Sequence, residues 1–203
     1  MLLSTAYMPC IEYIAYIAQS TLIHIEAHEH YAKQTFRNRT YIASAQGLME
    51  LIIPVIQPNG SKTCIRDVRI SYAEAWQKKH WHAITSAYNS SPFFEYYQDV
   101  FHTFYTKQYT FLYDYNKEIL LTLLKACNIT TEIKDSASFT PLSNNTYDVR
   151  YTLSPKITSN IHIPEYTQVF AEKYPFLSQV SILDTLCNIG PDTGLYCKKI
   201  RLK

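Results

Sequence analysis

Glycine is scarce in this chain, with only 4 glycines among 203 residues. Phosphate-binding loops of the Walker and Rossmann types need several closely spaced glycines, which let the backbone approach the phosphate. The chain has no such run, and it also lacks the G-x-S-x-G motif that marks a hydrolase serine. This scarcity argues against a nucleotide site built from backbone amides.

A charge imbalance and long apolar runs are also missing. The formal net charge is +2, so composition gives no general attraction to nucleic acid or anionic lipid. No stretch of about 20 uninterrupted apolar residues occurs, so we expect no transmembrane helix. The apolar N-terminal segment carries Glu12 and lacks a basic leader, which favours a strand, a turn and a helix over a signal peptide.

The five cysteines form no C-x-x-C pair, and their number is odd. Free thiols in a reducing cytoplasm fit this pattern best. A chain of this length with 47% hydrophobic residues predicts one globular domain covering residues 1–203. The 18 tyrosines either lie scattered at the edges of the core or line a pocket that binds sugars or bases.

The first 30 residues alternate between extended and helical patterns. Residues 2–7 predict a buried strand, Pro9 favours a helix start, and apolar spacing continues the helix to about Gln19. Residues 21–28 return to a β-branched, extended pattern. This β-α-β unit predicts an α/β fold, a single domain whose mixed sheet begins with two parallel strands.

Further elements follow from turn signals and periodicity. Residues 38–43 and 49–56 flank Gln46-Gly47 and predict a hairpin. We expect a turn at 58–61, a strand at 63–70, and a helical middle segment that starts at a Ser71 cap and runs to Tyr88. The remaining expectations are helices over 93–115 and 116–128, a strand at 129–134, a mobile loop or lid at 135–160, and a helix at 179–188 that ends before Gly190.

An alternating polar run lies along the second predicted strand. Strand periodicity places His24, Glu26, His28 and His30 on one face, and these are zinc or iron ligand types. Neighbours on one face sit about 6–7 Å apart, so at most two of them reach one ion. We therefore expect a polar strand end at a pocket, with His28 and His30 binding substrate, and no metal.

A basic cluster follows that strand. Lys33, Arg37 and Arg39 lie among aromatic residues, and guanidinium groups match phosphate or carboxylate. The alternative is a solvated turn. The patch is too short to predict nucleic-acid binding.

Two polar residues stand on otherwise apolar helical faces. His80 lies on one face with Trp76, Ile84 and Tyr88, and serves either as a core histidine or as an acid/base group. Asp184, if buried, needs a partner, for which Lys33, Arg39 and His80 are the possibilities. Cys10 near a helix start is either a reactive thiol or a buried one.

Several segments resemble the WbqC-like family in order along the chain. Residues 7–14 correspond to its Y-L-P-W-x-G-Y-F-like segment, Trp76 to Tyr88 to its W-x-x-x-H-x-x-x-I-x-x-x-Y helix, and residues 180–190 to its closing L-S-I-x-D-L-L-F-N-x-G. Lys33, Asn38 and Arg39 match its K-x-x-W-x-N-R pattern. The chain departs from the family at Ser4-Thr5 and at Glu12, where the family has Gln-Pro and Gly.

The resemblance implies a place in bacterial O-antigen and surface-polysaccharide biosynthesis, without a settled reaction. We predict a cytoplasmic group transferase that uses an activated sugar or an acyl or aminoacyl donor, without a cofactor. The alternatives are a non-catalytic scaffold of glycan assembly and a metal-dependent hydrolase. The predicted catalytic residues are His80 and Asp184, and the predicted substrate-binding residues are Tyr7, His28, His30, Lys33, Asn38 and Arg39.

Overall fold

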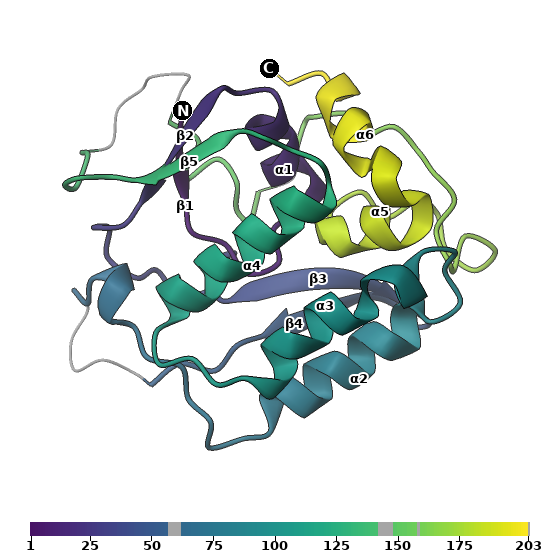
Figure 1. Cartoon of the computed structure of the whole chain (residues 1–203), viewed down its shortest axis with the longest axis horizontal. Coiled ribbons are helices and arrows are strands. Elements are labelled where there is room, and N and C mark those ends of the chain that lie inside the picture. Colours follow the sequence, from purple (N-terminus) through teal and green to yellow (C-terminus); the bar gives the residue numbers. More distant parts are fainter. Residues whose placement is uncertain (57–61, 142–147, 158, 203) are drawn as a thin grey trace.

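A parallel sheet organises the N-terminal half. The computed structural model describes residues 1–203 except 57–61, 142–147, 158 and 203. Strands β1 (Leu2–Ser4), β2 (Leu22–Glu26) and β5 (Glu132–Asp135) pair in parallel in the order β1-β2-β5. Helix α1 (Ile11–Ala18) connects β1 to β2 (Figure 1). The predicted β-α-β unit and the α/β fold class are confirmed, with strands shorter than expected.

A hairpin forms a second, separate sheet. Strands β3 (Arg39–Ser44) and β4 (Gly47–Ile52) pair antiparallel, with Ser44 opposite Gly47. Gly47 has a φ of +92°, a left-handed conformation that other residues rarely adopt. The hairpin predicted around Gln46-Gly47 is therefore confirmed.

Helices pack against strand β3 of this hairpin. Helix α2 (Trp76–Tyr88) packs on β3 and on α3 (Phe94–Thr106), and α4 (Leu112–Ala126) follows in the chain. Helix α5 (Ile182–Ile189) also contacts β3, and α6 (Thr193–Lys199) packs on α1 (Figure 1). None of the helices within the described residues is long and apolar enough to cross a membrane.

Some sequence predictions fail locally. The strand predicted at 63–70 is wrong: the chain forms a 3-10 turn, η1 (Ile65–Asp67), between single β-bridges. Ile65 and Val68 are both buried three residues apart, a spacing that aligns side chains on a 3-10 turn but places them on opposite faces of a strand. Helix α2 begins at Trp76 rather than at Ser71, and the Ser71 amide donates to the Pro54 carbonyl.

Other boundaries also differ from the predictions. Helices α3 and α4 are separated by residues 107–111 instead of meeting near 115, and α6 was not predicted. The turn predicted at 58–61 lies outside the described residues. So do residues 142–147 and 158 of the loop predicted at 135–160.

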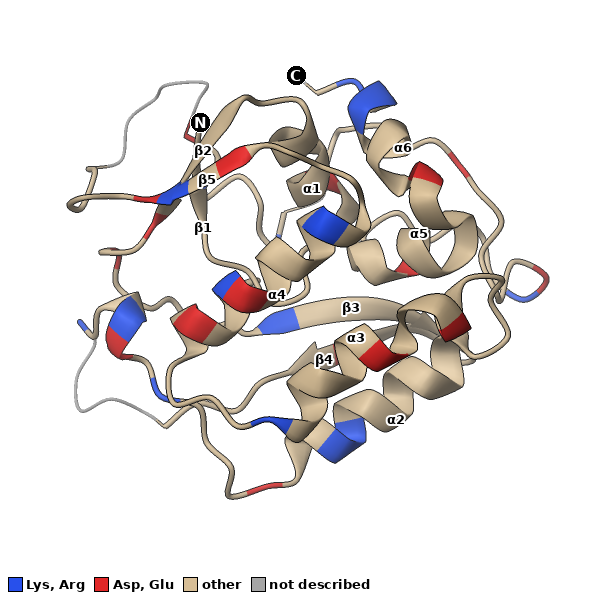
Figure 2. Ribbon diagram, in the orientation of Figure 1, with Lys and Arg blue, Asp and Glu red and all other residues tan. Residues whose placement is uncertain are grey.

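Two groups of buried charges lie at the carboxyl ends of β1 and β2. Arg150 donates to Glu26 at 3.0 Å and to Asp148 at 2.7 Å, and the side chains of Arg150 and Glu26 are fully buried. Arg37 pairs with Glu29 in an equally buried contact. Elsewhere, charges of both signs are interspersed over the ribbon (Figure 2). Burying these ions is costly unless each keeps its partner.

Hydrogen bonds complete the Glu26 site. Burial alone would raise the pKa of Glu26, but bonds from the Ser136 hydroxyl and the amides of Thr140 and His28, together with the charge of Arg150, lower it below its ordinary value. Glu26 is therefore ionised and holds three separate segments against the end of β2.

We predict that Arg150→Met lowers the free energy of unfolding by about 3–5 kcal/mol, because it leaves buried carboxylates without their cation. Urea unfolding measures this. Arg66→Met is the control, since the Arg66–Asp135 pair is largely exposed, and it should cost less than about 1 kcal/mol. Equal effects of the two substitutions would contradict a special role for the buried pair.

Candidate functional site

A pocket opens beside the N-terminal end of α1, which we call the α1 pocket. It holds about 430 Å³, counting the space open to solvent. A smaller pocket at the end of β1 shares Phe36 and Leu153 with it. Both therefore lie toward the carboxyl ends of parallel strands, where open α/β sheets bind ligands. The described lining residues are Cys10, Glu12, Phe36, Thr152, Leu153, Ser154, Ile157, Ser159, Ile161, Ile163, Ser178 and Gln179.

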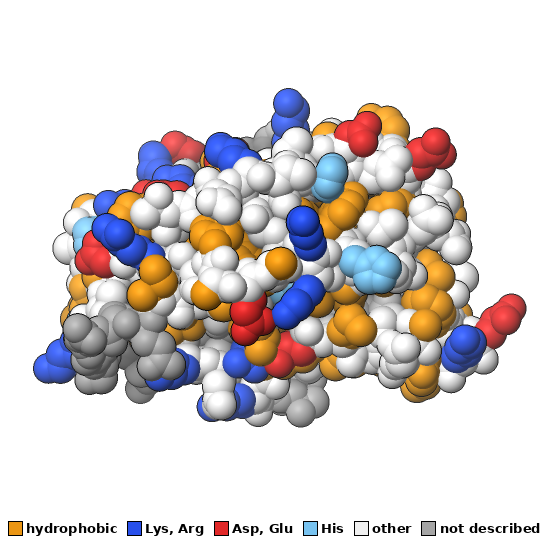
Figure 3. All heavy atoms as spheres, turned by 90° about the horizontal axis from the view of Figure 1, so that it is seen from below, with side chains coloured by type: hydrophobic (Ala, Val, Ile, Leu, Met, Phe, Trp, Pro, Cys, Tyr) orange, Lys and Arg blue, Asp and Glu red, His pale blue; other side chains and the backbone are white. Residues whose placement is uncertain are grey.

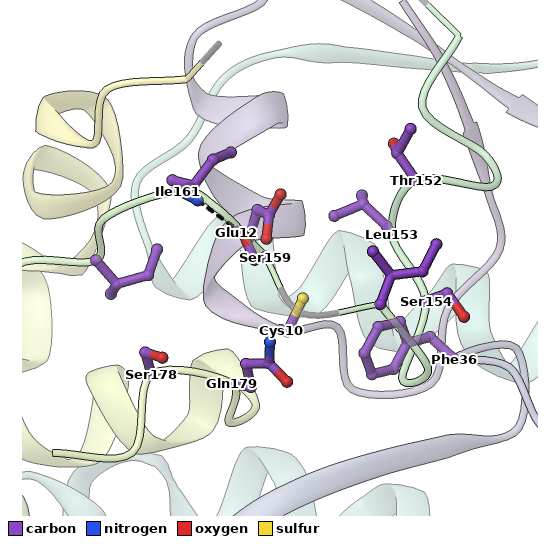
Figure 4. A pocket seen from close by; sticks show the side chains of 12 residues that line it. Cys10, Glu12, Phe36, Thr152, Leu153, Ser154, Ser159, Ile161, Ser178 and Gln179 are labelled. Atoms are coloured by element: carbon purple, nitrogen blue, oxygen red, sulfur yellow. Dashed lines mark hydrogen bonds between the residues drawn. The ribbon is translucent and has the colours of Figure 1, made fainter. Parts of the chain in front are cut away.

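The lining combines apolar walls with hydroxyl groups. Phe36, Leu153 and Ser154 lie on one side of Cys10, and Ser178 lies on the other (Figure 4). Isoleucines complete the apolar surface. Among the described lining residues, Glu12 is the one carboxyl group, and no Lys, Arg or His is present. Such a mixture of apolar surface and a few polar groups is typical of small-molecule sites.

Glu12 is the chemically distinctive residue of the pocket. It stands in the first turn of α1, half-buried among apolar neighbours. Burial raises the pKa of its carboxyl above the ordinary value, and a hydrogen bond with Ser159 offsets part of that rise. A carboxyl whose pKa is raised by burial in a cleft is a candidate for proton transfer.

Cys10 lines the same pocket, but it is a poor nucleophile. Burial raises the pKa of its thiol to about 12, although backbone hydrogen bonds act in the opposite direction. Nucleophilic attack requires the thiolate, which is a minor species at neutral pH here. The geometry therefore favours Cys10 as part of the wall.

The adjoining smaller pocket is lined by the two buried arginines. Arg37 donates to the Ser4 hydroxyl at 2.8 Å, and Ser4 in turn donates to Glu29 at 3.1 Å. Arg150 is held by Glu26 and Asp148, as described above. Both guanidinium groups are thus neutralised by protein carboxylates.

Tyr7 and His80 are the two predicted site residues that the structure brings into contact. The Tyr7 hydroxyl lies 2.9 Å from His80 Nδ1 and 3.0 Å from the Tyr105 hydroxyl. Burial lowers the pKa of His80 to about 4, so the ring is neutral at physiological pH. The pair is buried beneath α2 and lines neither of the two pockets described above.

Asp184 belongs to a different group. It accepts hydrogen bonds from the Tyr166 hydroxyl at 2.5 Å and from Gln168 Nε2 at 2.9 Å. Tyr88, two turns beyond His80 on α2, interacts with the Asp184 carboxyl. Because eight residues of α-helix span about 12 Å, Asp184 and His80 face different parts of α2. Burial raises the pKa of Asp184 despite these donors.

The other predicted binding residues are spread over the surface and the hairpin. Arg39 pairs with Glu50 across β3 and β4 at 2.5 Å, and Lys33 and His30 are exposed. His28 is half-buried, and the Asn38 side chain donates to the Ile53 carbonyl at 2.9 Å. None of these residues lines the α1 pocket as described. Within the described residues, no three His, Cys, Asp or Glu side chains gather as a metal ion would require.

Sequence reasoning missed Glu12, Ser159, Ser178 and Gln179 as site residues. The only available signal was Glu12 itself, a carboxylate at the start of an otherwise apolar helix. The hydroxyl residues come from a segment without periodicity, so nothing in their spacing indicated that they face α1.

Comparison with known proteins identifies relatives for most of the chain. Residues 5–160 match the WbqC-like protein family. The uncharacterized protein Rv1507c of Mycobacterium tuberculosis (strain ATCC 25618 / H37Rv) is 25% identical over 201 residues, covering 83% of this chain and 85% of that protein. No solved structure matches the chain.

We predict that Cys10 reacts slowly with thiol reagents in the folded protein at pH 8, because its pKa is raised to about 12. All five cysteines are free, so the unfolded chain should titrate five thiols without reductant. Mass spectrometry of alkylated peptides gives both readouts. Rapid native alkylation of Cys10 would show that its thiolate is accessible and would restore it as a nucleophile.

We predict that Glu12→Gln stabilises the protein at neutral pH. The folded state binds the Glu12 proton more tightly than the unfolded chain, and this contribution is lost as pH rises through the folded pKa. The melting temperature of the variant relative to wild type should therefore rise between about pH 4 and about pH 7. Glu95→Gln changes an exposed carboxylate in the first turn of α3, so its effect should not grow in this way.

Proposed function

Because the chain belongs to the WbqC-like protein family, we propose that it is a group-transfer enzyme of bacterial surface-polysaccharide biosynthesis. Its substrate is a small polyhydroxylated molecule held in the α1 pocket. The observation that carries this proposal is the position of Glu12, a carboxyl group facing a pocket lined by hydroxyl and amide side chains.

The composition of the pocket fits a sugar. Hydroxyl side chains both donate and accept hydrogen bonds, as sugar hydroxyls do, and Gln179 adds an amide. Phe36 and Leu153 provide apolar surface for the C–H faces of a sugar ring.

The proposed role of Glu12 is general base. An acceptor group on the substrate attacks the electrophilic carbon of an activated sugar or of an acyl or aminoacyl donor. As it attacks, the proton of the acceptor group moves to Glu12. The bond to the leaving group breaks, and the leaving group departs with the electron pair. The raised pKa of Glu12 suits both accepting the proton and returning it to solvent or to the leaving group.

His80 and Asp184 are better suited to supporting roles in this proposal. Their hydrogen bonds tie α2 to Tyr7, in the segment between β1 and α1, and α5 to residues 166–168. The catalytic roles inferred for the two residues from the sequence stay predictions. The variant His80→Gln tests the catalytic role of His80. If its role is structural, we expect reduced stability with activity retained in the folded fraction.

The alternative of a non-catalytic scaffold requires an exposed apolar patch. Large exposed apolar side chains occur on several elements, among them Leu48 on β4, Tyr96 on α3, Leu121 on α4 and Leu195 on α6. On the face seen in Figure 3, apolar side chains alternate with charged and polar ones. A scattered distribution of exposed apolar side chains favours the enzyme over the non-catalytic scaffold.

We predict that Glu12→Gln reduces turnover by about 10²–10⁴-fold, the usual contribution of a general base. The assay incubates the protein with hexoses and aminohexoses together with nucleotide-sugar, acyl-thioester and aminoacyl donors, and detects products by mass. Ser178→Trp, which fills the pocket, should abolish binding and turnover.

Glu95→Gln is the matched control, since it also removes a carboxylate from the first turn of a helix, but one that does not line the pocket. It should keep full activity. Turnover that survives both Glu12→Gln and Ser178→Trp would contradict the assignment of the site. The absence of turnover and of ligand-induced stabilisation across the whole panel would contradict the proposed function.

A further inference from the structure

We propose that the ligand of the α1 pocket carries a primary amino group, which binds as an ammonium ion to Glu12. This inference rests on the proposed function and names the substrate class of the same site. It stands on the charges that line the pocket and on those that surround it.

The described lining of the α1 pocket carries one charge, and that charge is negative. Glu12 is its carboxyl group, and no described lining residue is Lys, Arg or His. Cys10 stays a neutral thiol at physiological pH, since burial raises its pKa to about 12. A phosphate or carboxylate entering this space would meet a carboxylate and no described cation, whereas an ammonium ion would be attracted.

The arginines next to the pocket do not change this balance. Arg37 is paired with Glu29, and Arg150 is paired with both Glu26 and Asp148. The two guanidinium groups that line the adjoining smaller pocket are therefore paired with three carboxylates that lie outside its described lining. An anionic ligand would have to displace one of these carboxylates, which are buried and hydrogen-bonded.

The basic residues that sequence analysis assigned to an anion lie elsewhere. Arg39 is paired with Glu50 on the hairpin, and Lys33 is exposed on the loop before it. Neither lines the described part of the pocket. Any phosphate-bearing part of a donor therefore stays outside the α1 pocket, which is left for the amino-bearing substrate.

The surroundings of Glu12 supply acceptors for an ammonium group. An ammonium ion has three hydrogen atoms to donate. The Glu12 carboxylate accepts one, and the hydroxyl oxygens of Ser159 and Ser178 and the amide oxygen of Gln179 are further acceptors in the same lining. The apolar walls then exclude water around the ion pair, which strengthens it.

Calorimetric titration with aminohexoses tests the inference. The probes are hexoses with a free amino group at position 2, 3, 4 or 6, each compared with its parent hexose, its N-acetylated form and the corresponding hexose phosphate. We expect at least one free amine to bind wild type tenfold or more tightly than its three counterparts. Glu12→Gln should remove this preference, and Glu95→Gln should keep it.

The pH dependence separates an ion pair from a neutral hydrogen bond. Ammonium binding requires an ionised Glu12, so affinity should rise with pH through the raised pKa of that residue and fall where the amine loses its proton. In the Glu12→Gln variant, the rise of binding affinity with pH on the acidic side should disappear.

The outcomes distinguish this inference from the proposed function. Parent hexoses or N-acetylated forms that bind as tightly as the amines, in a manner blocked by Ser178→Trp, would overturn the amino-group inference and leave the proposed function standing. Preferred binding of the hexose phosphates would overturn the charge argument. If no sugar of any class binds, both the inference and the proposed function fail.

Discussion

The buried ion pairs at the carboxyl ends of β1 and β2 are the constraint on which the rest of the site depends. Arg150 joins Glu26, at the last position of β2, to a segment more than a hundred residues later in the chain. Arg37 joins Glu29 to Ser4 at the end of β1. Buried charges must keep their partners, so these contacts fix the position of the chain from residue 148 onward. Thr152, Leu153, Ser154, Ile157 and Ser159 can then face α1 and form a pocket wall.

The fold was predictable wherever a local pattern coincided with burial. Pro9 and the apolar spacing that follows it defined α1, and Gly47 at a positive φ defined the hairpin. The failure at 63–70 has a physical cause: this segment makes single bridges to three different partners, so no continuous ladder forms. Such pairings depend on where distant segments lie, and a local window of sequence does not contain that information.

The site was less predictable because residue type does not reveal environment. His80 and Asp184 have catalytic chemistry, yet tyrosine and glutamine side chains bind His80 Nδ1 and Asp184 Oδ2 in the interior, and the buried Asp184 Oδ1 has no hydrogen-bond partner among the described residues. The partners proposed for Asp184 from sequence were charged, whereas its actual partners, Tyr166 and Gln168, are neutral. Glu12 gave only a weak signal in the sequence, because its raised pKa comes from burial in a pocket whose lining includes residues some 150 positions away.

The two walls of the α1 pocket are held in different ways. The wall that carries Glu12 and Leu153 lies within residues 5–160, the part that matches the family, and the buried ion pairs anchor it. Ser178 and Gln179 lie outside that part, on a segment held by the bonds of Gln168 to the Leu177 backbone and to Asp184. Substitutions in this second wall can change the shape of the pocket without exposing a buried charge. The position of Glu12, the proposed proton-transfer group, is therefore tied to the stability of the sheet, while the opposite wall depends on neutral hydrogen bonds.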